Sequence, residues 1–167
     1  MKFLSIALLA ISILFTSCKN NEASDSNTNA AAKSIEQRID LAPFGLKADL
    51  LFPKLAESSS EYKIAHEVDG FDWQIFVDEK LFLTIEDLGE LNSRTYYKER
   101  YSNLNYYRLS SDKDSLIQFE NVENNTYSII KLVEFDLISY GIIAENVKDK
   151  EGMTATLTGA RIVAAKN

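Results

Sequence analysis

The residues best suited to binding chemistry are concentrated in one stretch, residues 94–108. It holds five of the eight tyrosines and four basic side chains against one acid, in a chain whose formal net charge is −7. Tyrosine supplies a rigid surface with a polar tip and arginine supplies forked donors, a composition typical of binding surfaces, and aromatic faces also stack on sugar rings. The side chains that we expect to contact a protein or glycan partner are Tyr96, Tyr97, Arg100, Tyr101, Tyr107 and Arg108.

The same tyrosines could instead pack inward. On a helix over residues 88–101, Tyr97 and Tyr101 share one stripe, whereas Tyr96 lies about 100° away from Tyr97. On the following strand, Tyr107 would face the opposite side from Tyr106. Core packing and partner binding are therefore two open interpretations of this stretch.

The sequence contains few of the residue patterns from which a catalytic site is built. His66 is the only histidine, so a Ser-His-Asp arrangement or a zinc site would depend on it, and no serine lies in a Gly-x-Ser-x-Gly motif. The six glycines are scattered singly, and Asp112-Lys113-Asp114 lacks the glycine and distant glutamate of a calcium loop. We expect a non-enzymatic protein without a cofactor or metal. Its acidity also argues against nucleic acid as a partner.

The N-terminal segment has the pattern of a secretory signal. Lys2 precedes the thirteen-residue stretch Phe3–Phe15, which is apolar except for two serines; Thr16 and Ser17 then precede Cys18, the only cysteine. Phe15–Cys18 resembles the lipobox of bacterial lipoprotein precursors, and the Asn/Ser-rich sequence that follows is similar to that of Bacteroidetes-type lipoproteins. In that family the cysteine thiol is lipidated and the chain is cut before it. The resemblance implies a cleaved signal peptide, 1–17, and lipid attachment at Cys18.

Two other interpretations of this segment fit less well. A spanning helix needs about 20 apolar residues, which is more than this stretch supplies. An ordinary cleaved signal would leave Cys18 as a lone free thiol in an exported protein. Two or three acyl chains would hold the protein stably on a membrane. Because Lys19 rather than aspartate follows the cysteine, the sorting rule of enteric lipoproteins implies the outer membrane of the cell envelope.

Composition divides the remaining chain into a tether and a domain. Removing 17 of the 167 residues leaves 150 and takes away one basic charge, so the net charge falls from −7 to −8. Residues 18–34 contain the lipidated cysteine and a polar, flexible tether without large apolar side chains. Residues 35–167 are long enough for a single globular domain, and they resemble no family that we recognise.

The clearest predicted element is a hairpin centred on Asp69-Gly70, a dipeptide that suits a two-residue turn. One face of this hairpin is apolar or aromatic except for His66, and the other is polar. The pairs expected on the apolar face are Val68–Phe71, His66–Trp73, Ile64–Ile75 and Tyr62–Val77, and the polar face carries Lys63, Glu67, Asp72 and Gln74.

The other elements follow from apolar spacing and turn residues. A short helix is expected to start at Ser34, bury Ile35 and Ile39, and end at Pro43, and a second helix is expected over residues 88–101. The expected strands are Leu81–Glu86, Leu104–Ser110, Ser115–Val122, Thr126–Phe135, Leu137–Asn146 and Met153–Ala164, with turns at Asp112–Asp114, Glu123–Asn125 and Lys148–Gly152. The expected fold is α+β or mostly β, with about eight mainly antiparallel strands and one or two helices. A curled sheet, a small barrel and a sandwich all fit this order.

Two functions follow from these features. The anchor and the lack of a catalytic arrangement favour a non-enzymatic binding or accessory lipoprotein with a protein or glycan partner. The alternative is a carrier of a small apolar ligand inside a curled sheet, because amphipathic strands and aromatic residues are abundant.

Overall fold

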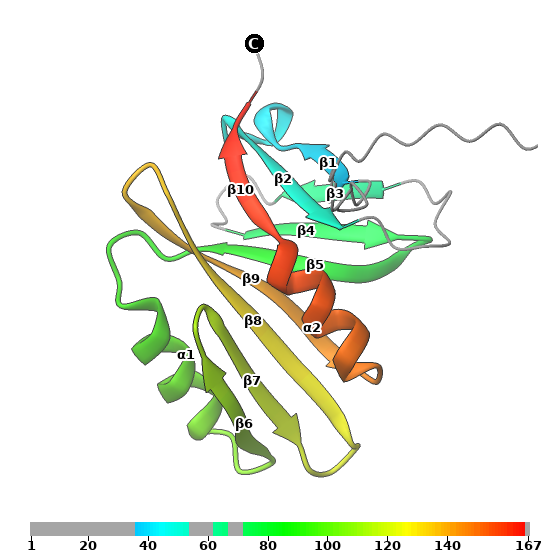
Figure 1. The fold of residues 1–167 in the computed structure, drawn as a ribbon, viewed down its shortest axis with the longest axis vertical. Coiled ribbons are helices and arrows are strands. Elements are labelled where there is room, and N and C mark those ends of the chain that lie inside the picture. Colours follow the sequence, from blue (N-terminus) through cyan, green and yellow to red (C-terminus); the bar gives the residue numbers. More distant parts are fainter. Residues whose placement is uncertain (1–35, 54–61, 67–71, 166–167) are drawn as a thin grey trace, which may run out of the picture. The chain divides into compact units, whose positions relative to one another are not determined.

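The computed structural model describes residues 36–53, 62–66 and 72–165, which belong to one compact unit extending over Lys33–Asn167. The fold is mostly β, with two antiparallel sheets and two helices, as the sequence predicts (Figure 1). The large sheet has the order β3 (Tyr62–His66), β4 (Asp72–Val77), β5 (Lys80–Asp87), β9 (Ile138–Val147), β8 (Thr126–Phe135), β7 (Leu116–Asn121) and β6 (Tyr107–Lys113). The small sheet has the order β1 (Glu36–Asp40), β2 (Ala48–Pro53) and β10 (Arg161–Ala164). The helices are η1 (Ala42–Phe44, a 3-10 turn), α1 (Ser93–Ser102) and α2 (Lys150–Gly159). The large sheet is open, with β3 and β6 at its edges, and not a closed barrel.

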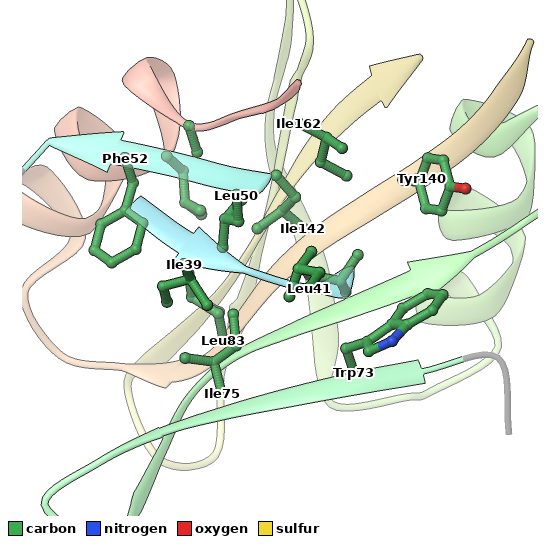
Figure 2. Close-up of a cluster of buried hydrophobic side chains, with 14 of the residues drawn as sticks. Ile39, Leu41, Leu50, Phe52, Trp73, Ile75, Leu83, Tyr140, Ile142 and Ile162 are labelled. Atoms are coloured by element: carbon green, nitrogen blue, oxygen red, sulfur yellow. The ribbon is translucent and has the colours of Figure 1, made fainter. Parts of the chain in front are cut away.

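The two faces of the large sheet are covered by different layers. On the first face, Ile129 and Ile142 pack in one core with Leu50 of the small sheet and Leu157 of α2. On the second face, their sequence neighbours Ile130 and Ile143 pack against α1. The alternation of side chains along each strand therefore supplies both cores. Figure 2 shows the first core, where side chains of the two sheets meet.

The register of the predicted hairpin is confirmed where the structure describes it. Strands β3 and β4 pair Tyr62 with Val77, Ile64 with Ile75 and His66 with Trp73. The turn at Asp69-Gly70, the pair Val68–Phe71 and Glu67 lie outside the described residues. Lys63, Asp72 and Gln74 are exposed on the opposite face, as the alternation predicts.

The predicted N-terminal helix is wrong, because Glu36–Asp40 is strand β1. Ser34 and Ile35 lie outside the described residues. β1 pairs along its whole length with β2, a strand the sequence analysis did not assign, and this pairing buries Ile39. Pro43 lies in the η1 turn that follows, where its fixed φ is tolerated.

The strand predicted at Met153–Ala164 is also wrong over most of its length. Residues 150–159 form α2, and only Arg161–Ala164 is a strand, β10. Asp149 caps the helix by accepting a hydrogen bond from the Gly152 amide at 3.0 Å. The hydroxyls of the three threonines in α2 form hydrogen bonds within the helix, because each donates to the backbone carbonyl four residues earlier. These bonds join Thr154 to Lys150, Thr156 to Gly152 and Thr158 to Thr154.

The remaining predicted helix and strands are present, most of them with shifted boundaries. The second helix begins at Ser93 rather than at residue 88, and the strand expected from Leu104 begins at Tyr107. β6 continues through Lys113, so its turn starts at Asp114, which has a positive φ of 52°. Thr126–Phe135 is a strand with the predicted bounds.

Candidate functional site

Helix α1 carries most of the tyrosine-rich stretch and lies on the second face of the large sheet. Its start is fixed by Asn92, whose side chain accepts a hydrogen bond from the Thr95 amide at 3.0 Å. Tyr97 and Tyr101, one turn apart, are 0 % and 2 % exposed and point at the sheet. These two rings therefore form the face of α1 that packs on the large sheet.

Tyr97 lies over strand β5 and its neighbour β9. Its hydroxyl donates to Oε2 of Glu86 at 2.8 Å, and Nη1 of Arg100 donates to Oε1 of the same carboxylate at 2.6 Å. Glu86 is only 8 % exposed, so these two donors compensate the cost of burying its charge.

Gly141 makes room for the Tyr97 ring. It lies opposite Glu86 in the pairing of β5 with β9. A β-carbon at residue 141 would lie 1.8 Å from the Tyr97 hydroxyl oxygen and 2.5 Å from Cζ. A side chain at this position would displace the Tyr97 ring from the place where its hydroxyl bonds Glu86.

Tyr101 makes the equivalent contact further along β9. Its hydroxyl donates to Oε1 of Glu145 at 2.7 Å. Its ring stacks on Phe119 with centroids 4.5 Å apart, and the Tyr107 ring meets it edge-on at 4.9 Å. Tyr107 in turn accepts a hydrogen bond from the Ser128 hydroxyl at 3.2 Å.

Both buried tyrosines are held in their neutral, hydrogen-donating form. Burial raises the pKa of Tyr97 well above its usual 10, and the charge and hydrogen bond of Glu86 raise it further. Burial likewise raises the pKa of Tyr101, and Glu145 adds to the rise. A deprotonated tyrosine in either place would leave two negative charges in contact.

The two edges of α1 face different parts of the sheet. Arg94 and Lys98 both form ion pairs with Asp112 of β6. With about 100° between successive residues, Tyr96 and Arg100 lie on the opposite edge, and the bond from Arg100 to Glu86 of β5 fixes its direction. Tyr96 is half-buried, and Arg100 is exposed.

The neighbouring part of this sheet face is polar and accessible. On β3, β4 and β5 the residues that alternate with the first core point to the α1 side. We call these residues, with Tyr96 and Arg100 at their border, the open face. Its sheet residues are Lys63, Ala65, Gln74, Phe76 and Thr84. The residues Lys63, Ala65 and Gln74 are exposed, whereas Thr84 and Phe76, which pairs with Lys63, are half-buried.

The structure brings together five of the six partner-binding residues predicted from the sequence and separates the sixth. Tyr97, Tyr101 and Tyr107 pack between α1 and the sheet, whereas Tyr96 and Arg100 border the open face. Arg108 follows Tyr107 on β6 and therefore points to the other side of the sheet. Among the described residues it forms no ion pair.

The lone histidine lies on the first face of the sheet. Its ring stacks on Trp73 with centroids 4.9 Å apart and planes at 8°, and Nδ1 lies 3.0 Å from the Asp72 carbonyl oxygen. Within the described ranges no three His, Cys, Asp or Glu side chains are grouped as metal ligands would be. Glu86 and Glu145 lie on the neighbouring strands β5 and β9, where each accepts a hydrogen bond from a different tyrosine of α1.

Sequence reasoning missed the partners of the tyrosines, Glu86 and Glu145. Glu86 precedes Tyr97 by 11 residues, and Glu145 follows Tyr101 by 44 residues. The available signal was chemical: a buried tyrosine hydroxyl needs an acceptor, and an acid on a buried strand face can supply it. Cys18 lies outside the described residues.

Comparisons with models of protein families, with curated proteins and with solved structures found no match. In the part of the chain that the structure describes, neither helix has the length and apolar character needed to cross a membrane.

Proposed function

We propose that this chain is a lipid-anchored protein of the bacterial cell envelope whose folded part is a non-enzymatic binding module for a protein or glycan. The anchor part of the proposal rests on the lipobox-like Phe15–Cys18, and the sorting rule favours the outer membrane. The binding part rests on the open face.

One observation carries the binding proposal: Arg100 is held by a buried carboxylate at the border of an accessible polar sheet face. Its side chain is 40 % exposed while Glu86 holds one of its nitrogens. The remaining guanidinium donors are therefore pre-oriented, which lowers the entropy lost when a partner binds. The half-buried Tyr96 supplies an aromatic surface beside it.

The open face has the chemistry of glycan and polar protein recognition. Gln74 offers an amide, Thr84 a hydroxyl and Lys63 an ammonium group on the sheet, and Tyr96 supplies an aromatic ring at its border. Sugar hydroxyls need both donors and acceptors, and their apolar ring faces stack on aromatic side chains. Only Lys63 of these sheet residues forms an ion pair, at 3.9 Å with Glu79, and both partners are largely exposed.

The packing of the core favours this function over an internal carrier. Large side chains from both sheets, such as Leu50, Phe52 and Ile142, are each 0 % exposed and occupy the space between the layers (Figure 2). A carrier would need that space for its ligand.

Two measurements on bacterial cells that express the chain test the proposal. The first compares the wild type with Cys18→Ser in membrane fractions. The wild type is expected in the membrane with an acylated N-terminal peptide by mass spectrometry, and the variant is expected in the soluble fraction. Equal distribution, or an unmodified wild-type cysteine, would contradict the anchor.

The second measurement compares chemical cross-linking of the wild type, a Tyr96→Ala/Gln74→Ala double variant and Arg108→Ala as a matched surface control. We expect the double variant to lose a protein or glycan that the wild type and the control both retain. Arg100 is kept because its removal would leave Glu86 buried with one partner fewer. Equal capture by all three proteins would contradict the assignment of the open face.

A further inference from the structure

The outer face of the small sheet borders a surface hollow whose lining residues are remote in sequence from α1. It has a volume of about 660 Å³ and opens to solvent. Its lining consists of Arg38, Asp40, Ala42, Lys47, Asp49, Ala164 and Ala165. The volume lies within the range of small-molecule sites, and the lining carries two positive and two negative side chains.

An ion pair between a buried carboxylate and a partly exposed guanidinium lines this hollow. Asp49 lies on the central strand β2 and is 3 % exposed, and it pairs with Arg38 of β1. The Arg38 side chain remains 34 % exposed. A guanidinium has five N–H donors, so the pair with Asp49 orients Arg38 and leaves donors for a ligand.

The negative charge of the second acidic residue in the hollow, Asp40, is only partly compensated by its neighbours. Asp40 lies directly opposite Asp49 in the pairing of β1 with β2, and like charges in this position repel each other. Arg38 pairs with Asp49 only, and Oδ1 of Asp40 accepts the Ala42 amide at 2.9 Å. The other oxygen of Asp40 is therefore available to a positively charged ligand group.

Lys47 supplies the complementary charge. It is exposed, lines the same hollow and forms no ion pair with any described residue, Asp40 included. Among the described residues, Lys47 and Asp40 thus border one hollow without forming an ion pair with each other or with a third residue. A ligand that carries both charges can meet each of them.

We propose that this hollow binds a small zwitterion of the α-amino-acid class, with its carboxylate at Arg38 and Lys47 and its ammonium group at Asp40. The buried Asp49 is a positioning residue that holds Arg38. The two contacts are of opposite sign, so the site selects for a molecule with both groups over one with either alone.

The test titrates the full chain with L-alanine, with acetate and methylammonium as single-charge probes, and follows amide resonances by NMR. We expect saturable shifts around residues 38–49 with L-alanine, and binding of either single-charge probe weaker by about tenfold or more. Binding of acetate as tight as that of L-alanine, or no saturable shift with L-alanine, would overturn the proposal.

Variants locate the two contacts. Lys47→Gln and Asp40→Asn replace exposed side chains with neutral ones of similar shape, and each should weaken L-alanine binding by about tenfold. Arg161→Gln, on the same small sheet but outside the hollow, should leave binding unchanged. Thermal unfolding checks that all three variants fold. Unchanged affinity in both folded hollow variants would overturn the assignment.

Discussion

Tyr97 and Tyr101 stand one helical turn apart on α1 and donate their hydroxyls to carboxylates on two different strands, Glu86 of β5 and Glu145 of β9. Both rings are almost fully buried, so the helix is attached by hydrogen bonds and by apolar area together. This attachment places Arg100 and Tyr96 at the border of the open face.

The hydroxyl of Tyr97 should contribute measurably to stability. Tyr97→Phe keeps the ring but removes a donor from the buried Glu86, and we expect the free energy of unfolding to fall by about 1–2 kcal/mol. Tyr96→Phe is the matched control, because no hydrogen bond of its hydroxyl is present among the described residues, and it should change stability by less than about 0.5 kcal/mol. Urea denaturation measures both. Equal effects of the two substitutions would show that the Tyr97–Glu86 bond contributes nothing net.

Gly141 should be intolerant of a side chain because of the Tyr97 ring. We expect Gly141→Ala to destabilise the protein by about 1–3 kcal/mol through overpacking. In a double-mutant cycle, Tyr97→Leu should remove part of that cost, so the double variant is more stable than the sum of the two single effects predicts. Additive effects would mean that the added methyl group is accommodated elsewhere.

The buried tyrosines predict a loss of stability at alkaline pH. Their folded-state pKa values are raised above the unfolded value near 10, so the folded protein keeps both protons where the unfolded chain releases them. Their contribution is complete below pH 10 and is lost as the pH rises, by up to about 1.4 kcal/mol per pH unit for each tyrosine. Denaturation between pH 9 and pH 12 measures the slope, which should be shallower in Tyr97→Phe. The same slope in both proteins would contradict the raised pKa of Tyr97.

The tip of the β8–β9 hairpin carries a strained apolar residue. Leu137 has a φ of 65° and is 97 % exposed, in a two-residue turn of the kind that favours glycine. Leu137→Gly should raise the free energy of unfolding by up to about 1 kcal/mol, because glycine adopts a positive φ without steric cost. Leu137→Ala is the control, since it removes the exposed side chain but keeps the strain. A gain in the alanine variant as large as in the glycine variant would contradict this cause.

The parts of the fold that the sequence predicted are those specified locally. Strand β8 has the predicted bounds, and the β3–β4 register follows from alternation about a short turn. The alternation of β-branched threonine with alanine and leucine in Thr-Ala-Thr-Leu-Thr is typical of a strand, yet these residues lie in α2. The cap at Asp149 fixes the start of the helix, and the threonine hydroxyls are satisfied by carbonyls of the preceding turn.

The pairing of β1 depends on distant sequence. β1 joins β2, and β2 also pairs with β10, which lies more than 100 residues further along the chain. A capping-box pattern at Ser34 gives no information about such partners. The same limit applied to α1: composition identified the tyrosines, but only the sheet register shows that Glu86 and Gly141 lie beneath Tyr97 and that Arg108 faces away.

The most direct test of the proposed function is site-specific photo-cross-linking in intact bacterial cells that express the full chain. A photoreactive residue replaces Gln74 on the open face in one variant and Arg108 on the opposite side of the sheet in another. We expect a covalent product with an envelope protein or glycan from position 74 and none from position 108. Products of equal yield from both positions, or from position 108 alone, would contradict it.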